Sequence, residues 1–288
     1  MRTGFIGLGA MGLPMARNLS HAGLLTAIWN RSRDKAAALA EETGCRLAAS
    51  PVDLTSDCEA IVLCVSADSD VLSVVDALTP GLGKNHIIID CSTVARSTAI
   101  DAAKRVRARG ADFLDCPVSG GTEGARLGTL AIMAGGAPET LERARPVLQV
   151  MGQRIVHMGD VGNGQATKAV NQVMAAGINQ AVTEALAFGD ALGLPMDALI
   201  DVIGGGAAGN WFLSHRGPTM VQGRFEPGFK LALHDKDLAI CEAMAAQAGG
   251  ELPTVHATRA HYQELMATGH GEQDISALYL LKRTLFSS

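Results

Sequence analysis

The sequence predicts an α/β domain with a parallel β-sheet, joined by a long helix to an all-helical domain. Short β-branched or apolar runs alternate with helical patterns in the first half of the chain, as in βαβ units with right-handed crossovers. Beyond residue 164 only helical patterns continue. A length of 288 residues suits two domains, and we expect them to cover residues 1–162 and 163–288.

The expected elements follow from hydrophobic spacing and from the glycines and prolines that interrupt it. A proline-free stretch at 165–192, which stops before Gly193 and Pro195, predicts one unusually long linking helix. Expected strands cover 3–6, 27–30, 60–65, 87–91, 113–117, 130–134 and 155–158. Expected helices cover 11–21, 33–43, 97–109, 138–150, 196–203, 236–247, 253–268 and 276–286.

Composition favours a globular enzyme over a nucleic-acid-binding, membrane or disordered protein. Hydrophobic residues make up 48% and charged residues 18%, and the net charge is −5 with dispersed basic residues. No run approaches the roughly 20 apolar residues of a membrane span. The six cysteines show no spacing of a zinc site, so we expect buried thiols in the reducing cytoplasm and no metal.

A GxGxxG turn follows the first predicted strand and opens a helical pattern, which is the context that dinucleotide binding requires. Gly7 would permit the tight turn, Gly9 would let the backbone approach a pyrophosphate, and Gly12 would allow close packing of helix and strand. The pyrophosphate would then lie at the positive end of the helix dipole. A merely glycine-rich turn is the alternative. The candidate cofactor-binding residues here are Gly7, Leu8, Gly9, Ala10, Met11 and Gly12.

The end of the second predicted strand favours NADP over NAD. Sites that prefer NAD usually carry an acidic residue there for the ribose 2′-hydroxyl, whereas this chain has Asn30 followed by Arg31 and Arg33. A guanidinium can bind a 2′-phosphate that a carboxylate would repel. Alternatively, Ser32 is a helix N-cap with Asp34 complementing the dipole, and the arginines are solvated.

Four separated segments together resemble the β-hydroxyacid dehydrogenases, a family that includes 3-hydroxyisobutyrate dehydrogenase and the tartronate, glyoxylate and succinic semialdehyde reductases. They are GLGAMGLPMARNL at 7–19, DCPVSGGTEGARLGTL at 115–130, GNGQATKAVNQ at 162–172 and HDKDLAI at 234–240. The resemblance spans nearly the whole chain. It implies a Rossmann-like first domain, a long interdomain helix, an all-helical second domain that forms a dimer or tetramer, and a nicotinamide-dependent oxidoreductase.

Lys168 and Asn171 are the candidate catalytic residues. They lie three residues apart at the start of the long helix, so their side chains share a face. Burial lowers the pKa of a lysine, which then can give a proton to a carbonyl oxygen or take one from a hydroxyl. The resemblance implies, in agreement with this chemistry, that Lys168 is the acid/base and that Asn171 hydrogen-bonds the substrate. For an isolated lysine a solvated surface position is the ordinary alternative.

The resemblance also implies binding roles for two further segments. Ser119, Gly120 and Gly121 would bind a substrate carboxylate through backbone N–H groups and a hydroxyl, although a simple glycine turn would look the same. Lys236 would bind the nicotinamide end of the cofactor. Alternatively, Lys236 and Asp237 form only an ion pair at a helix start, worth tenths of a kcal/mol.

Residues at the carboxyl ends of two predicted strands complete the candidate cofactor site, because ligands of such sheets lie there. These are Val65, Ser66 and Thr93, and Thr93 matches a cofactor-contacting threonine of the family. Asn210 is a further residue that could reach a ligand, whereas Phe229 is assigned to the core rather than to the active site.

The expected substrate is a class: a short 3-hydroxy acid, a 2-hydroxy acid or the corresponding semialdehyde. Two rival functions are an imine reductase and a non-catalytic dinucleotide sensor. The lysine at 168 together with Asn171 argues against both, because a sensor would not need an acid/base and imine reductases commonly have another residue there.

Overall fold

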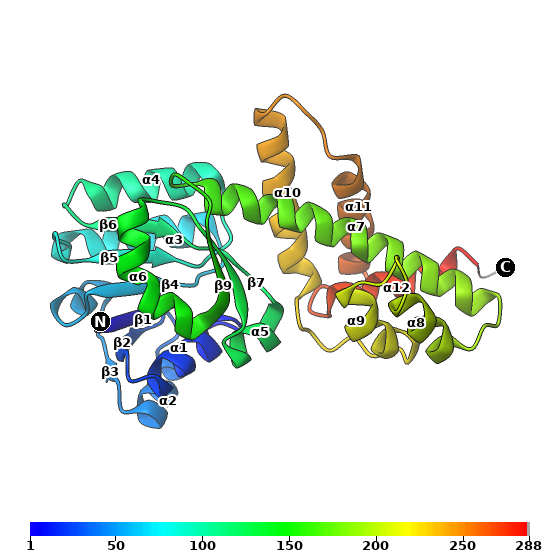
Figure 1. The fold of residues 1–288 in the computed structure, drawn as a ribbon, viewed down its shortest axis with the longest axis horizontal. Coiled ribbons are helices and arrows are strands. Elements are labelled where there is room, and N and C mark those ends of the chain that lie inside the picture. Colours follow the sequence, from blue (N-terminus) through cyan, green and yellow to red (C-terminus); the bar gives the residue numbers. More distant parts are fainter. Residues whose placement is uncertain (287–288) are drawn as a thin grey trace. The chain divides into compact units, whose positions relative to one another are not determined.

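The computed structural model describes residues 1–286, which form two compact units. The first unit spans Met1–Lys168 and the second begins at Ala169. The first contains all the strands that the structure describes, and the second contains helices alone (Figure 1).

Six parallel strands form the main sheet of the first unit, in the order β3-β2-β1-β4-β5-β6. The chain builds this sheet outward from β1 to one edge and then from β4 to the other. The strand order therefore reverses between β1 and β4, and ligands of open α/β sheets bind at the carboxyl ends of the strands beside such a reversal. The strands are β1 (Thr3–Ile6), β2 (Leu25–Trp29), β3 (Arg46–Leu47), β4 (Ala60–Leu63), β5 (Ile87–Asp90) and β6 (Asp112–Asp115).

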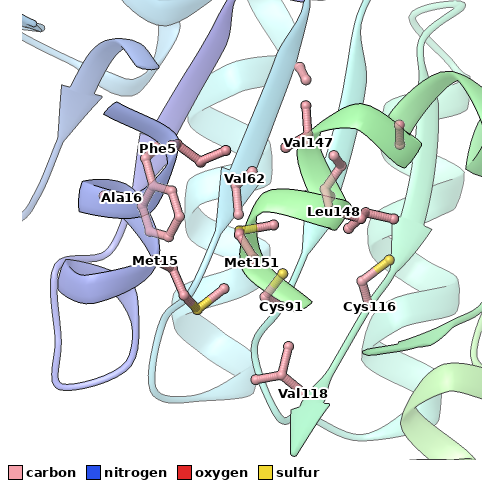
Figure 2. Packing of buried hydrophobic residues seen from close by; sticks show 14 of the residues in the cluster. Phe5, Met15, Ala16, Val62, Cys91, Cys116, Val118, Val147, Leu148 and Met151 are labelled. Atoms are coloured by element: carbon pink, nitrogen blue, oxygen red, sulfur yellow. The ribbon is translucent and has the colours of Figure 1, made fainter. Parts of the chain in front are cut away.

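Helices cover both faces of this sheet, which explains why β1, β4 and β5 are buried along their whole length. Figure 2 shows the packing on one face, where Phe5 and Val62 of the sheet meet Met15 and Met151 of the helices. This face packs against α1 (Gly12–His21), α2 (Arg33–Thr43) and α6 (Pro138–Met151). The other face packs against α3 (Asp68–Leu78), α4 (Arg96–Arg107) and the 3-10 turn η1 (Pro51–Ser56).

A smaller sheet extends the first unit beyond β6. In it β8 (Leu130–Ala134) pairs antiparallel with β7 (Val118–Ser119) and parallel with β9 (Gly152–His157). The helix α5 (Gly121–Leu127) connects β7 to β8. Side chains of β7 and β8 belong to the same hydrophobic cluster as the main sheet, so the extension shares one core with it.

The second unit is a set of helices around one hydrophobic core. Its first helix, α7 (Asn163–Ala191), starts in the first unit, and Gly193 follows it with φ = +69°. No helix within residues 1–286 is both long and apolar enough to cross a membrane. The other helices are α8 (Met196–Gly204), α9 (Trp211–Val221), α10 (Leu231–Gln247), α11 (Pro253–Ala267), α12 (Leu278–Thr284) and the short 3-10 turn η3 (Ile275–Ala277).

The structure confirms the expected fold class, including the long helix, and corrects several elements. The helix expected from residue 236 begins five residues earlier, at Leu231. Sequence reasoning missed the two-residue strands β3 and β7 because they are too short to show alternation. It also missed α5, α9 and α3. Only α3 carries a clear signal, with buried valines and leucine at 71, 74, 75 and 78.

Asp90, the last residue of β5, is fully buried in the first unit. One carboxylate oxygen accepts a hydrogen bond from the backbone N–H of Ser92 at 3.0 Å, and Oδ2 has no hydrogen-bond partner. Burial raises the pKa of this carboxyl to about 7, and the neighbouring Asp115 adds to the effect. An ionised Asp90 therefore destabilises the fold.

We predict that Asp90→Asn stabilises the protein increasingly as pH rises. The pKa of Asp90 in the folded protein, about 7, lies above the ordinary value of 3.8. Between these two pH values the folded protein binds a proton at Asp90 that the unfolded chain has released. The free energy of unfolding of the wild type therefore falls as pH rises from about 4 to 7. The slope is about 1.4 kcal/mol per pH unit, which amounts to a few kcal/mol over this range. Asparagine keeps the acceptor for Ser92 and cannot ionise. The measurement is the midpoint of urea unfolding at pH 4.5 and 7.5.

The comparison uses the difference between variant and wild type at each pH, which removes any constant cost of the amide. Glu139→Gln, which neutralises an exposed carboxylate on α6, is the control and should show a much smaller change of that difference. An Asp90→Asn difference that is equal at both pH values would show that Asp90 does not titrate in this way.

Candidate active site

The turn between β1 and α1 contains three glycines with different structural roles. Gly7 has φ = +98°, and a Cβ atom there would lie 2.2 Å from the carbonyl oxygen of Cys64. A Cβ atom on Gly12 would lie 1.9 Å from the carbonyl oxygen of Gly7, so packing demands glycine at both positions. A Cβ atom on Gly9 would meet nothing within 4 Å. The protein's own packing thus leaves open space in front of Gly9, and this fits the close approach of a dinucleotide pyrophosphate.

Asn30, immediately after β2, ties this turn to the neighbouring strand. Its Oδ1 accepts a hydrogen bond from the backbone N–H of Leu8 at 2.9 Å, and its Nδ2 donates to the carbonyl oxygen of Ser32 at 2.9 Å. Asn30 therefore holds the turn in place, a role that sequence reasoning did not foresee.

The two arginines beside Asn30 are exposed to solvent. The Arg31 side chain is 85% exposed and forms an ion pair with Asp70 at 3.1 Å. Ser32 occupies the N-cap position of α2, but its side chain makes no capping hydrogen bond. An exposed guanidinium held by one carboxylate remains accessible to a phosphate, since such a surface pair is worth little.

Residues after β4 and β5 form a hydrogen-bonded edge at the carboxyl ends of the strands. The Ser92 hydroxyl accepts from the backbone N–H of Val65 at 2.9 Å, so that N–H already has a partner. The side-chain amide of Gln165 donates to the Ser92 carbonyl at 2.8 Å and accepts from the backbone N–H of Val94 at 3.1 Å. In the same two loops Ser66 is exposed and Thr93 is half-buried. Gln165 was not foreseen, although it lies within the family-like segment at 162–172.

Asp115, at the end of β6, anchors the first turn of α7. Its carboxylate accepts from the backbone N–H of Gly162 at 2.8 Å and of Gln165 at 2.9 Å. A Cβ atom on Gly135 would lie 2.4 Å from Asp115 Oδ1, and one on Gly164 would lie 2.5 Å from its carbonyl oxygen. Burial raises the pKa of Asp115, and the hydrogen bonds that it accepts oppose that shift. This close packing fixes where α7 begins.

Lys168 lies in the second turn of α7, one turn beyond this anchor. It is 7% exposed, so it is not a solvated surface cation. Asn171, half-buried, follows one turn later on the same helix. The helix therefore presents the two polar side chains on adjoining turns of one side.

Ser119, Gly120 and Gly121 lie where a short strand passes directly into a helix. Ser119 ends β7 and pairs with Ala131 of β8, whereas Gly121 is the first residue of α5. Gly120 has φ = +135° and Gly121 has φ = +62°, conformations that favour glycine. The segment is thus a tight junction of strand and helix, held in a defined shape.

Lys236 also lies elsewhere than expected, within α10 rather than at its start. Its Nζ lies 2.9 Å from Oδ1 of Asp237, so the ion pair considered as an alternative is present. The other oxygen of Asp237 accepts a hydrogen bond from Gln172 Nε2 at 2.7 Å, and Gln172 Oε1 accepts from Asn171 Nδ2 at 2.9 Å. Sequence reasoning missed Gln172, whose partner is 65 residues away.

Two expected features lie outside this set. Phe229 packs at the edge of the second unit's core, with its ring centroid 5.2 Å from that of His234. Asn210 caps α9 by accepting the backbone N–H of Leu213 at 2.9 Å. Within residues 1–286, no group of three or more His, Cys, Asp or Glu residues could hold a metal ion.

The chain matches two family models that together cover most of it. Residues 2–159 match the NAD binding domain of 6-phosphogluconate dehydrogenase, and residues 162–281 match the NAD-binding domain of NADP-dependent 3-hydroxyisobutyrate dehydrogenase.

Relatives match over nearly their whole length. The chain is 35% identical over 287 residues to 2-hydroxy-3-oxopropionate reductase of Escherichia coli and 32% identical over 287 residues to the NAD-dependent L-serine dehydrogenase of Pseudomonas aeruginosa, covering 96% of both chains in each case. A solved structure of 3-hydroxyisobutyrate dehydrogenase from Mycobacterium tuberculosis with L-serine has a TM-score of 0.88 at 32% identity, covering 98% of this chain and 100% of that one. This protein therefore belongs to the 3-hydroxyisobutyrate dehydrogenase family and is an NAD(P)-binding oxidoreductase of the hydroxyacid dehydrogenase type.

Proposed function

We propose that the protein reduces a small semialdehyde or 2-oxo acid to the hydroxy acid, and catalyses the reverse oxidation, with Lys168 as general acid/base. The observation that carries this proposal is the burial of Lys168, which is 7% exposed one turn beyond the Asp115 anchor. A buried ammonium group on a fixed helix can be held at one place for proton transfer. Lys168 and Asn171 together favour this function over imine reduction.

The proton-transfer chemistry follows from what each residue can do. A bound nicotinamide supplies or accepts the hydride. In reduction, the Lys168 ammonium donates a proton to the carbonyl oxygen as negative charge develops there, and it regains a proton from solvent afterwards. In oxidation, the neutral amine takes the hydroxyl proton. Asn171 hydrogen-bonds the same oxygen, which fixes its position for the transfer.

Ser119, Gly120 and Gly121 are the proposed carboxylate-binding segment. The positive φ values of the two glycines support this role, because successive N–H groups in such turns can point toward one anion. The relatives named above are a reductase of 2-hydroxy-3-oxopropionate and a dehydrogenase of L-serine, both small three-carbon carboxylates. We therefore propose that the substrate is a short 3-hydroxy acid, a 2-hydroxy acid or the corresponding semialdehyde.

For the cofactor we propose a preference for NADP. Asn30 in place of an acidic residue and the accessible guanidinium of Arg31 support it. The proposed cofactor contacts are the turn 7–12, Asn30, Arg31, Val65, Ser66, Thr93 and Lys236.

We further propose that the functional domains divide between residues 162 and 163, and that the protein is a cytoplasmic dimer or tetramer. Exposed apolar side chains of the second unit, such as Met174 (63% exposed) and Val202 (69% exposed), support self-association.

Lys168→Ala is expected to lower turnover by about two to four orders of magnitude, the usual share of acid/base catalysis. Dinucleotide affinity should be nearly unchanged, because the glycine turn is intact. The measurement is steady-state kinetics of NADPH or NADH oxidation with glyoxylate and with succinic, methylmalonate and tartronate semialdehydes, alongside calorimetric binding of the nucleotide. Near-normal turnover of Lys168→Ala on a substrate that the wild type reduces would refute the assignment.

Asn30→Asp is expected to shift cofactor preference from NADPH toward NADH, by about tenfold or more in the ratio of kcat/KM values. Aspartate keeps an oxygen that can accept the N–H of Leu8, but its charge repels a 2′-phosphate and suits a 2′-hydroxyl. Asn30→Ala is the control: it loses the hydrogen bond to Leu8 and should weaken both cofactors alike. An unchanged ratio in Asn30→Asp would show that this position does not set the preference.

A further inference from the structure

Gln172 lies at the centre of a continuous set of polar contacts within the second unit. Its Oε1 accepts from Asn171 Nδ2 at 2.9 Å, and its Nε2 donates to Asp237 Oδ2 at 2.7 Å. Asp237 Oδ1 in turn lies 2.9 Å from Lys236 Nζ. The series runs from α7 to α10 and has Asn171 at one end and Lys236 at the other.

Burial makes these contacts strong and specific. Gln172 is 2% exposed and Asp237 is 4% exposed, so neither side chain can exchange its partners for bulk water. A buried carboxylate needs hydrogen bonds or an opposite charge, and Asp237 has one of each, on separate oxygens. The Gln172 amide and the Lys236 ammonium thus contact the two oxygens of one carboxylate.

Glutamine suits this position because it carries a donor and an acceptor on one rigid group. Nε2 must face the carboxylate, since turning the amide over would set Oε1 against a negative charge. That orientation leaves Oε1 to accept from Asn171, which holds the Asn171 amide in one rotation. A single side chain thus makes a directional hydrogen bond to each neighbour.

We infer that Gln172 is a positioning residue that orients Asn171 for the substrate and, through Asp237, Lys236 for the cofactor. This inference rests on the proposed function, in which those two residues bind the two reactants. Gln172 acts on the reactants through these two neighbours. Its loss therefore affects cofactor affinity and substrate parameters together, without removing the acid/base.

The test is Gln172→Met, which preserves length and apolar volume and removes the amide. We expect the Kd of NADPH, measured by calorimetry, to rise about tenfold and kcat/KM for the carbonyl substrate to fall about tenfold or more, which is the scale for losing a hydrogen bond to a charged group. Circular dichroism and the urea midpoint report whether the fold is intact. If Gln172→Met does not fold, Asp237→Asn breaks the same series at the ammonium and is measured in the same way.

A double-mutant cycle with Lys236→Met separates positioning from a general structural effect. If Gln172 acts on the cofactor through Lys236, then Gln172→Met adds almost nothing to the Kd of NADPH once Lys236 is Met. A merely structural role would give additive changes, and additivity would overturn the inference.

Gln180→Met is the matched control on the same helix. Gln180 Nε2 also makes two contacts across to another helix, at 3.1 Å to Thr258 Oγ1 and 3.0 Å to His261 Nδ1, but it is not connected to Asn171 or Lys236. Its substitution should leave the Kd of NADPH and kcat/KM close to wild type. If Gln172→Met behaves like Gln180→Met while Lys236→Met weakens NADPH, the inference fails and the proposed function stands. If Lys236→Met has no effect on NADPH, the proposed role of Lys236 fails instead.

Discussion

The buried carboxylate of Asp115 is the interaction on which the start of α7, and with it the place of Lys168, depends. It accepts backbone N–H groups at 162 and 165, and the glycines at 135 and 164 leave no room for a side chain around it. A negative charge at the start of a helix also complements the helix dipole. Because the helix starts at a fixed point beside the sheet, Lys168 in its second turn is fixed there too. A lysine in the second turn of a freely placed helix would have no defined target.

The parts of the fold that the sequence predicted are those written in local patterns. The glycine turn at 7–12 requires glycine for reasons of backbone conformation and packing, and such requirements leave a spacing that can be read directly. Alternating strands and helices likewise predicted the sheet, and a proline-free run predicted α7. Where the local pattern was weak, prediction failed: two-residue strands have no period, and the start of α10 at Leu231 lies in a stretch whose polar residues mask the helical face.

The polar contacts could not be predicted because they join residues far apart in the chain. Asn30 reaches back 22 residues to Leu8, Asp115 reaches 50 residues to Gln165, and Gln172 reaches 65 residues to Asp237. Each partner looks ordinary in its own segment, and only the folded chain shows that a carboxylate or amide has been buried with a matching group. Resemblance to a family located the segments, but it did not reveal how Asn30 or Gln172 is used.

The two proposed lysines are placed by the same physical device in different units. In the first unit a buried aspartate fixes the start of α7, and the Gln165 amide links that start to the loop after β5. In the second unit a buried aspartate contacts Lys236 directly, and the Gln172 amide links it to α7. Both glutamines use donor and acceptor at once, so each works only when its two neighbours are correctly placed. In this arrangement the two proposed lysines are held by contacts within the protein and not by the substrate. Residues that contact the substrate can therefore vary without moving either lysine. Differences in substrate among relatives are then expected to arise outside these networks.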